Sequence, residues 1–493
     1  MKFFWEIGCL NLRGFWIKWE DMIMILMDIN SILKTVDDFV WGLPLIIFIL
    51  AVGIFLTIRL RGLQVRRLFL AVRNLLANEK TGGDGEVSGF GALCTALSAT
   101  IGTGNIVGVA TALVAGGPGA LFWMVVAAIV GTVTKYAECL LAIKYRVVAE
   151  DGHIVGGPFY YIEKGMGRGW KWLGKLFAFF GVGVGLLGIG TFTQINGITS
   201  AVNSFFDPDN QWTVELFHRD YSWTVVIAGI ILTVCVALVL IGGLKRISSV
   251  AEVLVPFMAA TYITAALLIL VFHVTEIPAA FVTIVQSAFG LKAAAGGVMG
   301  AMIVAMQKGV ARGIFSNEAG LGSAPIAAAA VQTDEPAAQG LVSMLGTVID
   351  TVIICTMTGL TIVITGTWNI GLDGVDVTTK AFQIGLPFQP AVSSFILMVC
   401  LVCFAFTTIL GWDYYSEKCL EYLVGGHQGV LKAYRWLYIL CVFIGPFMTV
   451  SAVWTIADIF NGLMAVPNLI AIIALNGVVV AETKQYLKKI DGK

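Results

Sequence analysis

Charged residues are scarce in this sequence of 493 residues, because Asp, Glu, Lys and Arg together make up only 13% of it. In soluble proteins these four residues make up about 25%. Hydrophobic residues make up 58%, and the mean hydropathy is +0.88. A soluble globular protein is therefore excluded. The formal net charge is zero, which also argues against nucleic-acid binding, since that function needs a concentrated basic face.

Motifs for nucleotide and metal chemistry are missing as well. The sequence has no GxxxxGK[ST] loop to hold the phosphates of ATP. Cys400 and Cys403 lie one helical turn apart, but no histidine is near them, and a buried cysteine behaves as a small hydrophobic residue. The histidines lie in or beside predicted loops: His153, His218, His273 and His427. We therefore expect no cofactor, no histidine-based metal centre and no enzyme.

Long apolar windows recur along the chain. A helix needs roughly 20 apolar residues to cross the lipid core. Eleven windows qualify: residues 41–60, 88–114, 119–143, 173–203, 222–242, 251–272, 297–331, 338–365, 391–424, 434–455 and 462–481. The sequence therefore predicts an all-α polytopic membrane protein with about 11 transmembrane helices. The seventh window contains Lys308, Arg312 and Glu318, so it must break or face protein or water. We expect Glu318 to pair with Arg312 or Lys308.

Basic residues indicate the orientation in the membrane. They concentrate in residues 61–87, 144–175 and 483–493, which all lie on one side if there are eleven spans. Because basic loops stay in the cytoplasm, we expect the N-terminus outside and the C-terminus in the cytoplasm. The stretch from Arg61 to Asn78 has arginines and leucines at helical spacing, which indicates a helix lying on the lipid headgroups. A solvated connector is the alternative.

Two of the predicted spans contain polar, glycine-rich interruptions. One is Ser98–Asn105 (SATIGTGN) in the second span, and the other is Gly313–Gly320 (GIFSNEAG) in the seventh. The two spans are five apart, so they run through the membrane in opposite directions. This arrangement indicates an inverted repeat. Interrupted helices at matching places in two halves typically mark the binding site of a secondary transporter.

These features divide the chain into five parts. They are an N-terminal extension (1–36), a first span with a cytoplasmic amphipathic connector (37–87), repeat 1 with spans 2–6 (88–272), repeat 2 with spans 7–11 (297–482) and a cytoplasmic tail (483–493). The extension mixes aromatic and charged residues and lacks the cleavage site of a signal peptide. We expect translation to start near Met22 or Met27.

An unwound segment at membrane depth has a definite chemistry. It frees backbone groups for which lipid offers no partner. The N-terminus of a half-helix then presents N–H groups and a positive dipole end to a carboxylate, and freed carbonyls with Ser or Thr hydroxyls suit a small cation. Gly102 and Gly104 let a ligand approach the backbone without a Cβ in the way. The alternative is that glycines here only allow close helix packing.

Other spans contribute polar and aromatic residues. Phe192 and Gln194 lie in the fourth span, and Thr407, Thr408 and Trp412 lie in the ninth. A single threonine within a span commonly bonds the carbonyl four residues earlier. Two adjacent threonines in the span expected opposite the first interruption are less readily explained in this way. For Trp412 we expect a pocket wall, with an anchor at the membrane interface as the alternative.

Several long blocks of the sequence resemble a known family. They are SATIGTGNIVGVATALVAGGPGALFWM, TKYAECLLAIKYR, GGPFYYIEKGMG, GIFSNEAGLGSAPIAAAA and GWDYYSEKCLEYL. They are similar to blocks of the alanine/glycine:cation symporters, also described as sodium:alanine symporters, and the match runs from about residue 36 to 486. The resemblance implies a LeuT-type 5+5 inverted repeat with one extra N-terminal span and two broken helices. It also implies import of alanine or glycine with Na⁺, or with H⁺ in some members. We expect a protein of a bacterial or archaeal cytoplasmic membrane in which a single chain contains the full pathway.

The resemblance further implies roles for particular residues. The amino-acid-binding positions of the family match Gly102, Thr103, Gly104, Asn105, Phe192, Gln194 and Trp412. The cation positions match the backbone at Ser98 and Ile101 and the hydroxyls of Thr407 and Thr408. The signature Ser316-Asn317-Glu318 in the second broken helix either contacts ligand or braces the break. An ion channel is the rival interpretation, although channels usually assemble repeated short subunits around one pore.

Overall fold

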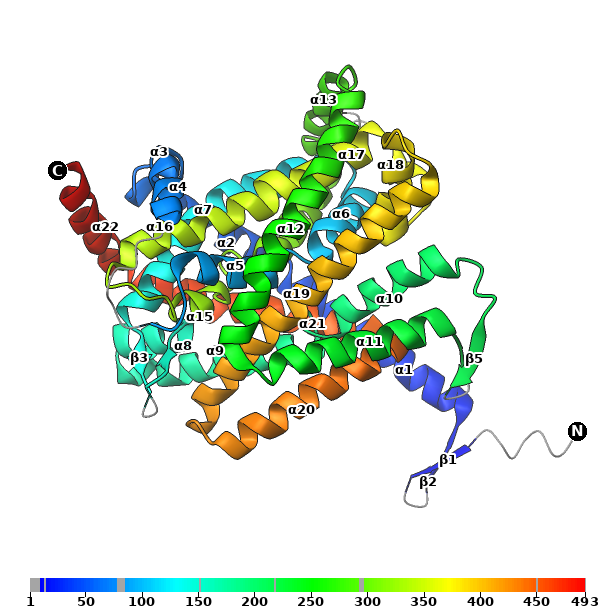
Figure 1. The fold of residues 1–493 in the computed structure, drawn as a ribbon, viewed down its shortest axis with the longest axis horizontal. Coiled ribbons are helices and arrows are strands. Elements are labelled where there is room, and N and C mark those ends of the chain that lie inside the picture. The colour runs from blue at the N-terminus through cyan, green and yellow to red at the C-terminus, as the bar shows by residue number, and fades with distance from the viewer. Residues whose placement is uncertain are drawn as a thin grey trace, which may run out of the picture.

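The computed structural model describes residues 9–12, 15–77, 85–149, 152–216, 219–291, 297–448 and 451–492. Helices dominate this part of the chain (Figure 1). Its strands form antiparallel two-stranded hairpins: β1 (Cys9–Leu12) with β2 (Phe15–Lys18), β3 (Val147–Val148) with β4 (Ile154–Val155), and β5 (Thr213–Leu216) with β6 (Arg219–Ser222). Residues 1–8 and 13–14 of the predicted N-terminal extension lie outside the described residues.

Ten helical segments of the described chain are long and apolar enough to cross a membrane, and one bent pair raises the number to eleven. In chain order they are Asn30–Arg59, the bent pair Gly89–Thr100 with Gly104–Gly116, Gly119–Lys144, Arg168–Phe206, Trp223–Leu240, Gly243–Phe272, Val298–Asn317, Pro336–Ile364, Pro390–Val424, Gln428–Phe447 and Thr455–Ala474. We number them spans 1 to 11. The prediction of an all-α polytopic membrane protein is confirmed.

The spans are built from the following helices. Spans 1 to 6 contain α1 (Trp19–Val40) and α2 (Leu43–Arg59); α5 (Gly89–Thr100), the π-helix η1 (Gly104–Gly108) and α6 (Val109–Gly116); α7 (Gly119–Lys144); α9 (Lys171–Leu187) and α10 (Phe192–Phe206); α11 (Trp223–Leu240); and α12 (Gly243–Phe272). Spans 7 to 11 contain α14 (Val298–Asn317); α16 (Pro336–Thr347), the π-helix η4 (Val348–Cys355) and α17 (Thr356–Ile364); α19 (Pro390–Val424); α20 (Gln428–Ile444) and η6 (Gly445–Phe447); and α21 (Ser451–Ala474).

Shorter helices lie between the spans: α3 (Leu63–Arg66), α4 (Leu68–Ala77), α8 (Pro158–Tyr160), η2 (Tyr161–Gly165), α13 (Ile277–Ala288), α15 (Ala324–Ala328), η5 (Thr367–Asn369) and α18 (Val375–Gly385). The short η3 (Arg168–Trp170) begins span 4, and α22 (Asn476–Asp491) follows span 11. Figure 1 shows α3, α4, α22 and β3 on one side of the molecule, and α18 and β5 on the opposite side. Arg67 and Asp491 form an ion pair of 2.5 Å that joins the first connector to α22. The basic connections therefore gather on one side.

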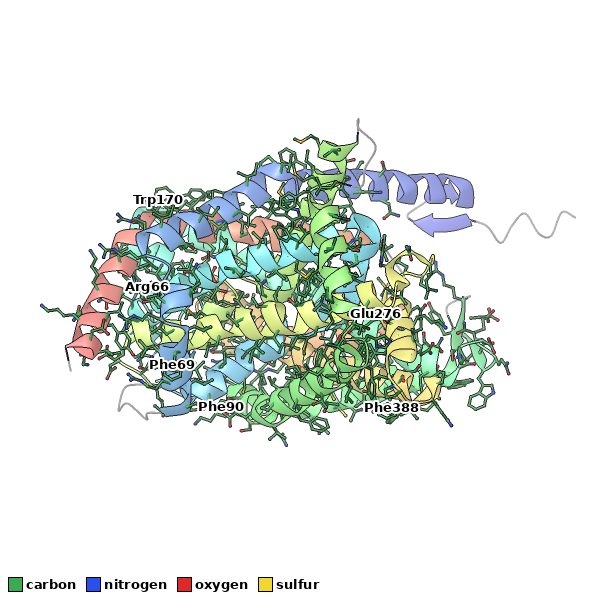
Figure 2. All side chains as sticks on the ribbon, turned by 90° about the horizontal axis from the view of Figure 1, so that it is seen from above. Arg66, Phe69, Phe90, Trp170, Glu276 and Phe388 are labelled. Carbon is green, nitrogen blue, oxygen red and sulfur yellow. The ribbon has the colours of Figure 1, made fainter. Side chains whose placement is uncertain are left out.

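The outer surface carries many large apolar side chains. Phe69 is 82% exposed and Phe388 is 44% exposed, and both lie at the periphery in Figure 2. In a soluble monomer such a surface would be a liability, because large exposed apolar patches favour association. It is suited to contact with lipid.

Span 2 breaks inside the predicted interruption. The helix α5 starts at the N-cap Ser88, whose hydroxyl accepts a hydrogen bond of 2.9 Å from the N–H of Gly91. It ends at Thr100, and Ile101 is extended with φ −78° and ψ 94°. The helix resumes at Gly104 and is bent by 53°.

The second interruption lies within the predicted stretch Gly313–Gly320. The helix α14 continues through Gly313 and ends at Asn317, so the break falls in the second half of that stretch. Glu318 then has φ 56°, a left-handed conformation that is uncommon for a residue with a side chain. The short helix α15 follows at Ala324. The predicted window 297–331 is thus one span and a short second helix.

Candidate functional site

The first break is held by side chains that bind its freed N–H groups. The N–H of Gly102 donates to Asn105 Oδ1 at 2.9 Å, and the N–H of Thr103 donates to Gln194 Oε1 at 3.1 Å. Gln194 reaches this point because span 4 is itself interrupted between α9 and α10. A Cβ on Gly102 would lie 2.5 Å from Thr408 Oγ1 and 3.1 Å from Gln194 Oε1. The close approach of these groups requires glycine at position 102.

Gly104 lies in a different environment. A Cβ on it would lie 3.3 Å from Phe315 Cδ1 and 3.3 Å from Ser316 Cα. The break in span 2 therefore packs directly against the last turn of α14. The two predicted interruptions, Ser98–Asn105 and Gly313–Gly320, therefore lie in contact at this point.

Asp350 connects the two broken helices. It lies in the π-helix η4 and is fully buried. Its Oδ1 accepts from Asn105 Nδ2 at 2.7 Å, and its Oδ2 accepts from Ser316 Oγ at 2.8 Å and from Thr351 Oγ1 at 2.6 Å. One carboxylate thus binds side chains from spans 2, 7 and 8. π-Helical turns are frequent at functional sites.

The second break is held by Glu318 and Asn317. Glu318 Oε1 accepts from Trp412 Nε1 at 2.8 Å, and its Oε2 accepts from Ser323 Oγ at 2.5 Å. Asn317 Oδ1 accepts from the N–H of Ala319 at 2.9 Å. The expected pairing of Glu318 with Arg312 or Lys308 is wrong, because Arg312 pairs with Asp458 instead.

Only part of the expected cation set comes together. Thr408 Oγ1 lies 3.3 Å from the carbonyl oxygen of Ile101, across spans 9 and 2. The hydroxyl of Ser98 donates to the carbonyl of Thr95 in its own helix at 2.7 Å. The hydroxyl of Thr407 donates to the carbonyls of its own helix and faces Met258 Sδ at 3.6 Å.

The two aromatic positions contact different neighbours. Trp412 is 1% exposed and binds the second break through Glu318. Phe192 is buried at the start of α10, near Gly445, where an added Cβ would lie 3.6 Å from Phe192 Cδ1. Trp412 therefore braces span 7 in this conformation.

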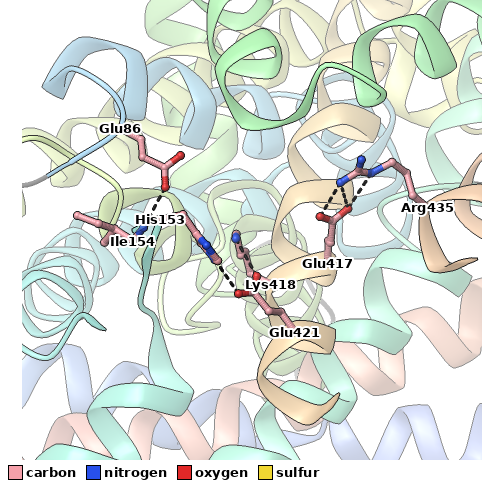
Figure 3. Close-up of polar contacts among 7 residues, drawn as sticks. All are labelled: Glu86, His153, Ile154, Glu417, Lys418, Glu421 and Arg435. Atoms are coloured by element: carbon pink, nitrogen blue, oxygen red, sulfur yellow. Dashed lines mark hydrogen bonds and ion pairs between the residues drawn. The ribbon is translucent and has the colours of Figure 1, made fainter. Parts of the chain in front are cut away.

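Polar contacts also join the ends of the spans on the side of β3 and β4. His153 Nε2 lies 2.7 Å from Glu421 Oε1, and the N–H of Ile154 donates to Glu86 Oε1 at 3.0 Å. Figure 3 marks both contacts. Lys418 Nζ lies 2.8 Å from Glu421 Oε2. The hairpin β3–β4 thus links the segment before span 2 to the end of span 9.

Comparisons with known proteins agree with this architecture. A sequence model of the sodium:alanine symporter family matches residues 26–493. The chain belongs to this family. It is 46% identical over 468 residues to the sodium/alanine symporter AgcS of Methanococcus maripaludis, covering 93% of this chain and 98% of that protein. It is 52% identical over 466 residues to an uncharacterized transporter of Haemophilus influenzae, with 94% and 97% covered. A probable sodium/glutamine symporter of Bacillus subtilis, GlnT, is 35% identical over 463 residues, with 94% and 91% covered.

Membership of the sodium:alanine symporter family confirms the resemblance seen in the sequence. The family consists of symporters, so the protein is a multi-pass membrane transporter and not an enzyme. Among the described residues, no group of three or more His, Cys, Asp or Glu side chains is placed to hold a metal ion.

Four buried Lys, Asp or Glu residues of the spans were missed by reasoning from the sequence. They are Lys135, Glu138, Asp350 and Asp413. Lys135 is 2% exposed, and its Nζ has no hydrogen-bond partner among the described residues. Glu138 Oε1 accepts from Asn468 Nδ2 at 2.6 Å, while its Oε2 is also unpartnered there. The available signal was simple, since an ionisable residue inside an apolar span marks a functional site by default.

Proposed function

We propose that this protein imports a small neutral amino acid, alanine or glycine, together with Na⁺ through a prokaryotic cytoplasmic membrane by alternating access. The observation that carries the proposal is the fully buried Asp350 carboxylate, which binds both broken helices through Asn105 and Ser316. Ionisable groups at membrane depth are costly, so their presence there usually marks a functional site. The similarity to a sodium/alanine symporter supports the choice of cargo.

The amino acid is proposed to bind at the first break. Its carboxylate would replace Asn105 and Gln194 as the partner of the N–H groups of Gly102 and Thr103. The space beside this backbone is small, because Thr408 approaches Gly102 and Phe315 approaches Gly104. This restricts the side chain to a few atoms and favours alanine and glycine over glutamine.

Na⁺ is the proposed coupling ion, with H⁺ as the alternative. The carbonyl of Ile101 and the hydroxyl of Thr408 are the cation ligands that the geometry supports. Ser98 and Thr407 are proposed as further cation ligands, through a backbone carbonyl or through a hydroxyl that has rotated away from its own helix. A Na⁺ ion between spans 2 and 9 would draw the two helices together and shape the adjacent backbone at Gly102.

In the proposed cycle, a core bundle that contains the broken spans 2 and 7 rocks against the remaining spans. The contacts of His153, Ile154 and Glu86 would close the cytoplasmic side while the site faces outward. The N-terminus is proposed to be outside and the C-terminus cytoplasmic, with one chain forming the pathway.

One charge crossing 100 mV supplies about 2.3 kcal/mol, and a tenfold Na⁺ gradient supplies about 1.4 kcal/mol more. Together they support roughly several-hundredfold accumulation.

Uptake into proteoliposomes tests the proposal. Labelled alanine, glycine and glutamine are offered with a Na⁺ gradient or a pH gradient imposed separately, and liposomes without protein measure the background. We expect saturable uptake of alanine and glycine that requires Na⁺. Uptake driven only by the pH gradient would replace Na⁺ by H⁺. A Na⁺ flux that neither saturates nor needs an amino acid would favour the channel and refute the symporter.

A further inference from the structure

A polar cavity lies outside the network at the breaks. It has a volume of about 250 Å³ and is lined by Asp37, Trp41, Lys308, Arg312, Phe315 and Asp458. These residues come from spans 1, 7 and 11, which enter the membrane from the same side because all three are odd-numbered. In the proposed orientation that side is the outside. Asp37, Trp41 and Asp458 lie in the halves of their spans nearest that side, whereas Lys308 and Arg312 lie past the middle of span 7, toward the break.

The charges in this cavity are of both signs and incompletely paired. Arg312 Nη2 lies 3.6 Å from Asp458 Oδ2, beyond the usual hydrogen-bond range of about 2.7–3.2 Å. Asp37 Oδ1 is buried without a hydrogen-bond partner among the described residues. Lys308 lines the cavity with an exposed side chain. Buried polar atoms are normally hydrogen-bonded, so the unpartnered Asp37 Oδ1 beside the long Arg312–Asp458 contact points to a polar ligand.

We propose that the cavity is a second amino-acid site, which binds a small zwitterion with its carboxylate toward Arg312 and Lys308 and its ammonium toward Asp37 and Asp458. A zwitterion is the ligand class that satisfies both sets of charges at once. A simple cation would be repelled by Arg312 and Lys308, and a simple anion would be repelled by the carboxylates. The volume is below the roughly 300–1,000 Å³ of pockets for drug-sized ligands, which suits a molecule of the size of alanine.

The floor of the cavity connects it to the first break. The Arg312 guanidinium lies 5.3 Å from the centroid of the Phe315 ring. The same ring approaches the backbone of Gly104, where a Cβ would lie 3.3 Å from Phe315 Cδ1. Movement of one ring would therefore open the cavity to the proposed central site. The sequence in which transport would use the cavity and the central site rests on the proposed function, whereas binding of an amino acid in the cavity does not.

Cysteine protection tests the second site. Ala311 also lines the cavity, and Ala311→Cys adds a thiol there with little change in volume. Purified protein is treated with a thiol-reactive reagent with and without alanine. Protein with Ala311 intact measures the background from native cysteines such as the exposed Cys235. The assay is repeated with Gly104→Val and, as a second variant of the central site, with Gly102→Ala.

We expect alanine to slow labelling at least fivefold even when either central-site variant is present. Propionate and ethylamine, which each carry only one of the two charges, should not protect at the same concentration. Asp37→Asn and Arg312→Gln should raise the alanine concentration for half-protection at least tenfold. The matched controls Asp376→Asn and Lys380→Gln, which are exposed on α18, should leave it unchanged.

Two results would overturn the inference. One is protection that disappears with both central-site variants, and the other is protection that is equal for alanine, propionate and ethylamine. The proposed function fails separately. Protection without Na⁺-dependent uptake would refute symport and leave the cavity as a binding site, whereas uptake without protection would refute only the cavity.

Discussion

Gly102→Ala is the sharpest test of the site, because the added methyl group has no space. Its carbon would lie 2.5 Å from Thr408 Oγ1 and 3.1 Å from Gln194 Oε1. Thr408 must therefore move from the carbonyl of Ile101, and Gln194 must loosen its hydrogen bond to the N–H of Thr103. The backbone conformation is open to alanine, since φ at Gly102 is not positive. The effect is therefore one of local crowding.

The expected magnitude follows from packing and hydrogen bonding. Overpacking costs about 1–3 kcal/mol, and a weakened hydrogen bond adds about 0.5–1.5 kcal/mol. If most of this falls on the ligand-binding conformation, alanine affinity drops about 5- to 100-fold. Gly108→Ala is the matched control in the same span, because a Cβ there meets nothing within 4 Å. It should bind normally and be equally or more stable, since alanine is favoured over glycine within a helix.

The assay measures alanine affinity at saturating Na⁺, Na⁺ activation of uptake and the melting temperature on the same preparations. Gly102→Ala should lose affinity for both solutes and keep a melting temperature near that of Gly108→Ala. Affinities equal to those of Gly108→Ala would refute the reasoning. A large fall in melting temperature with normal affinity in the folded fraction would show that Gly102 serves packing alone.

Three further substitutions test other contacts. Thr408→Ala removes the hydroxyl near Ile101 and should raise the half-activating Na⁺ concentration about 5- to 10-fold with little effect on alanine at saturating Na⁺; a larger effect of Thr407→Ala would contradict this placement. Asp350→Asn replaces an oxygen that accepts from Ser316 and Thr351 and should lower uptake at least tenfold, whereas the exposed Asp373→Asn should not; normal uptake by Asp350→Asn would remove the network from the mechanism. Glu421→Gln weakens the contacts with His153 and Lys418 and should raise the KM for external alanine by up to about threefold, because one hydrogen bond contributes roughly 0.5–1.5 kcal/mol to the closed cytoplasmic side. The control is Glu335→Gln. An unchanged KM for Glu421→Gln would show that this contact takes no part in gating.

Local sequence properties were sufficient for the membrane architecture and the first break. Whether a segment crosses the membrane depends on the summed hydropathy of about 20 neighbouring residues, and this is readable without any partner. The end of α5 at Thr100 likewise follows from adjacent small and polar residues that cannot continue a lipid-facing helix. The family blocks, being contiguous, were also visible in the sequence.

Only the tertiary structure decided which polar groups meet. Asn105 and Asp350 are 245 positions apart, and their 2.7 Å contact depends on how spans 2, 7 and 8 pack. Glu318 binds Trp412 because span 9 passes the second break, while the neighbouring Arg312 faces span 11 and pairs with Asp458. Charge alone could not distinguish these partners, since every carboxylate in the chain attracts every cation. Local hydropathy predicts where the spans lie along the chain. Which residues form the site depends on the packing of helices that are far apart in the sequence.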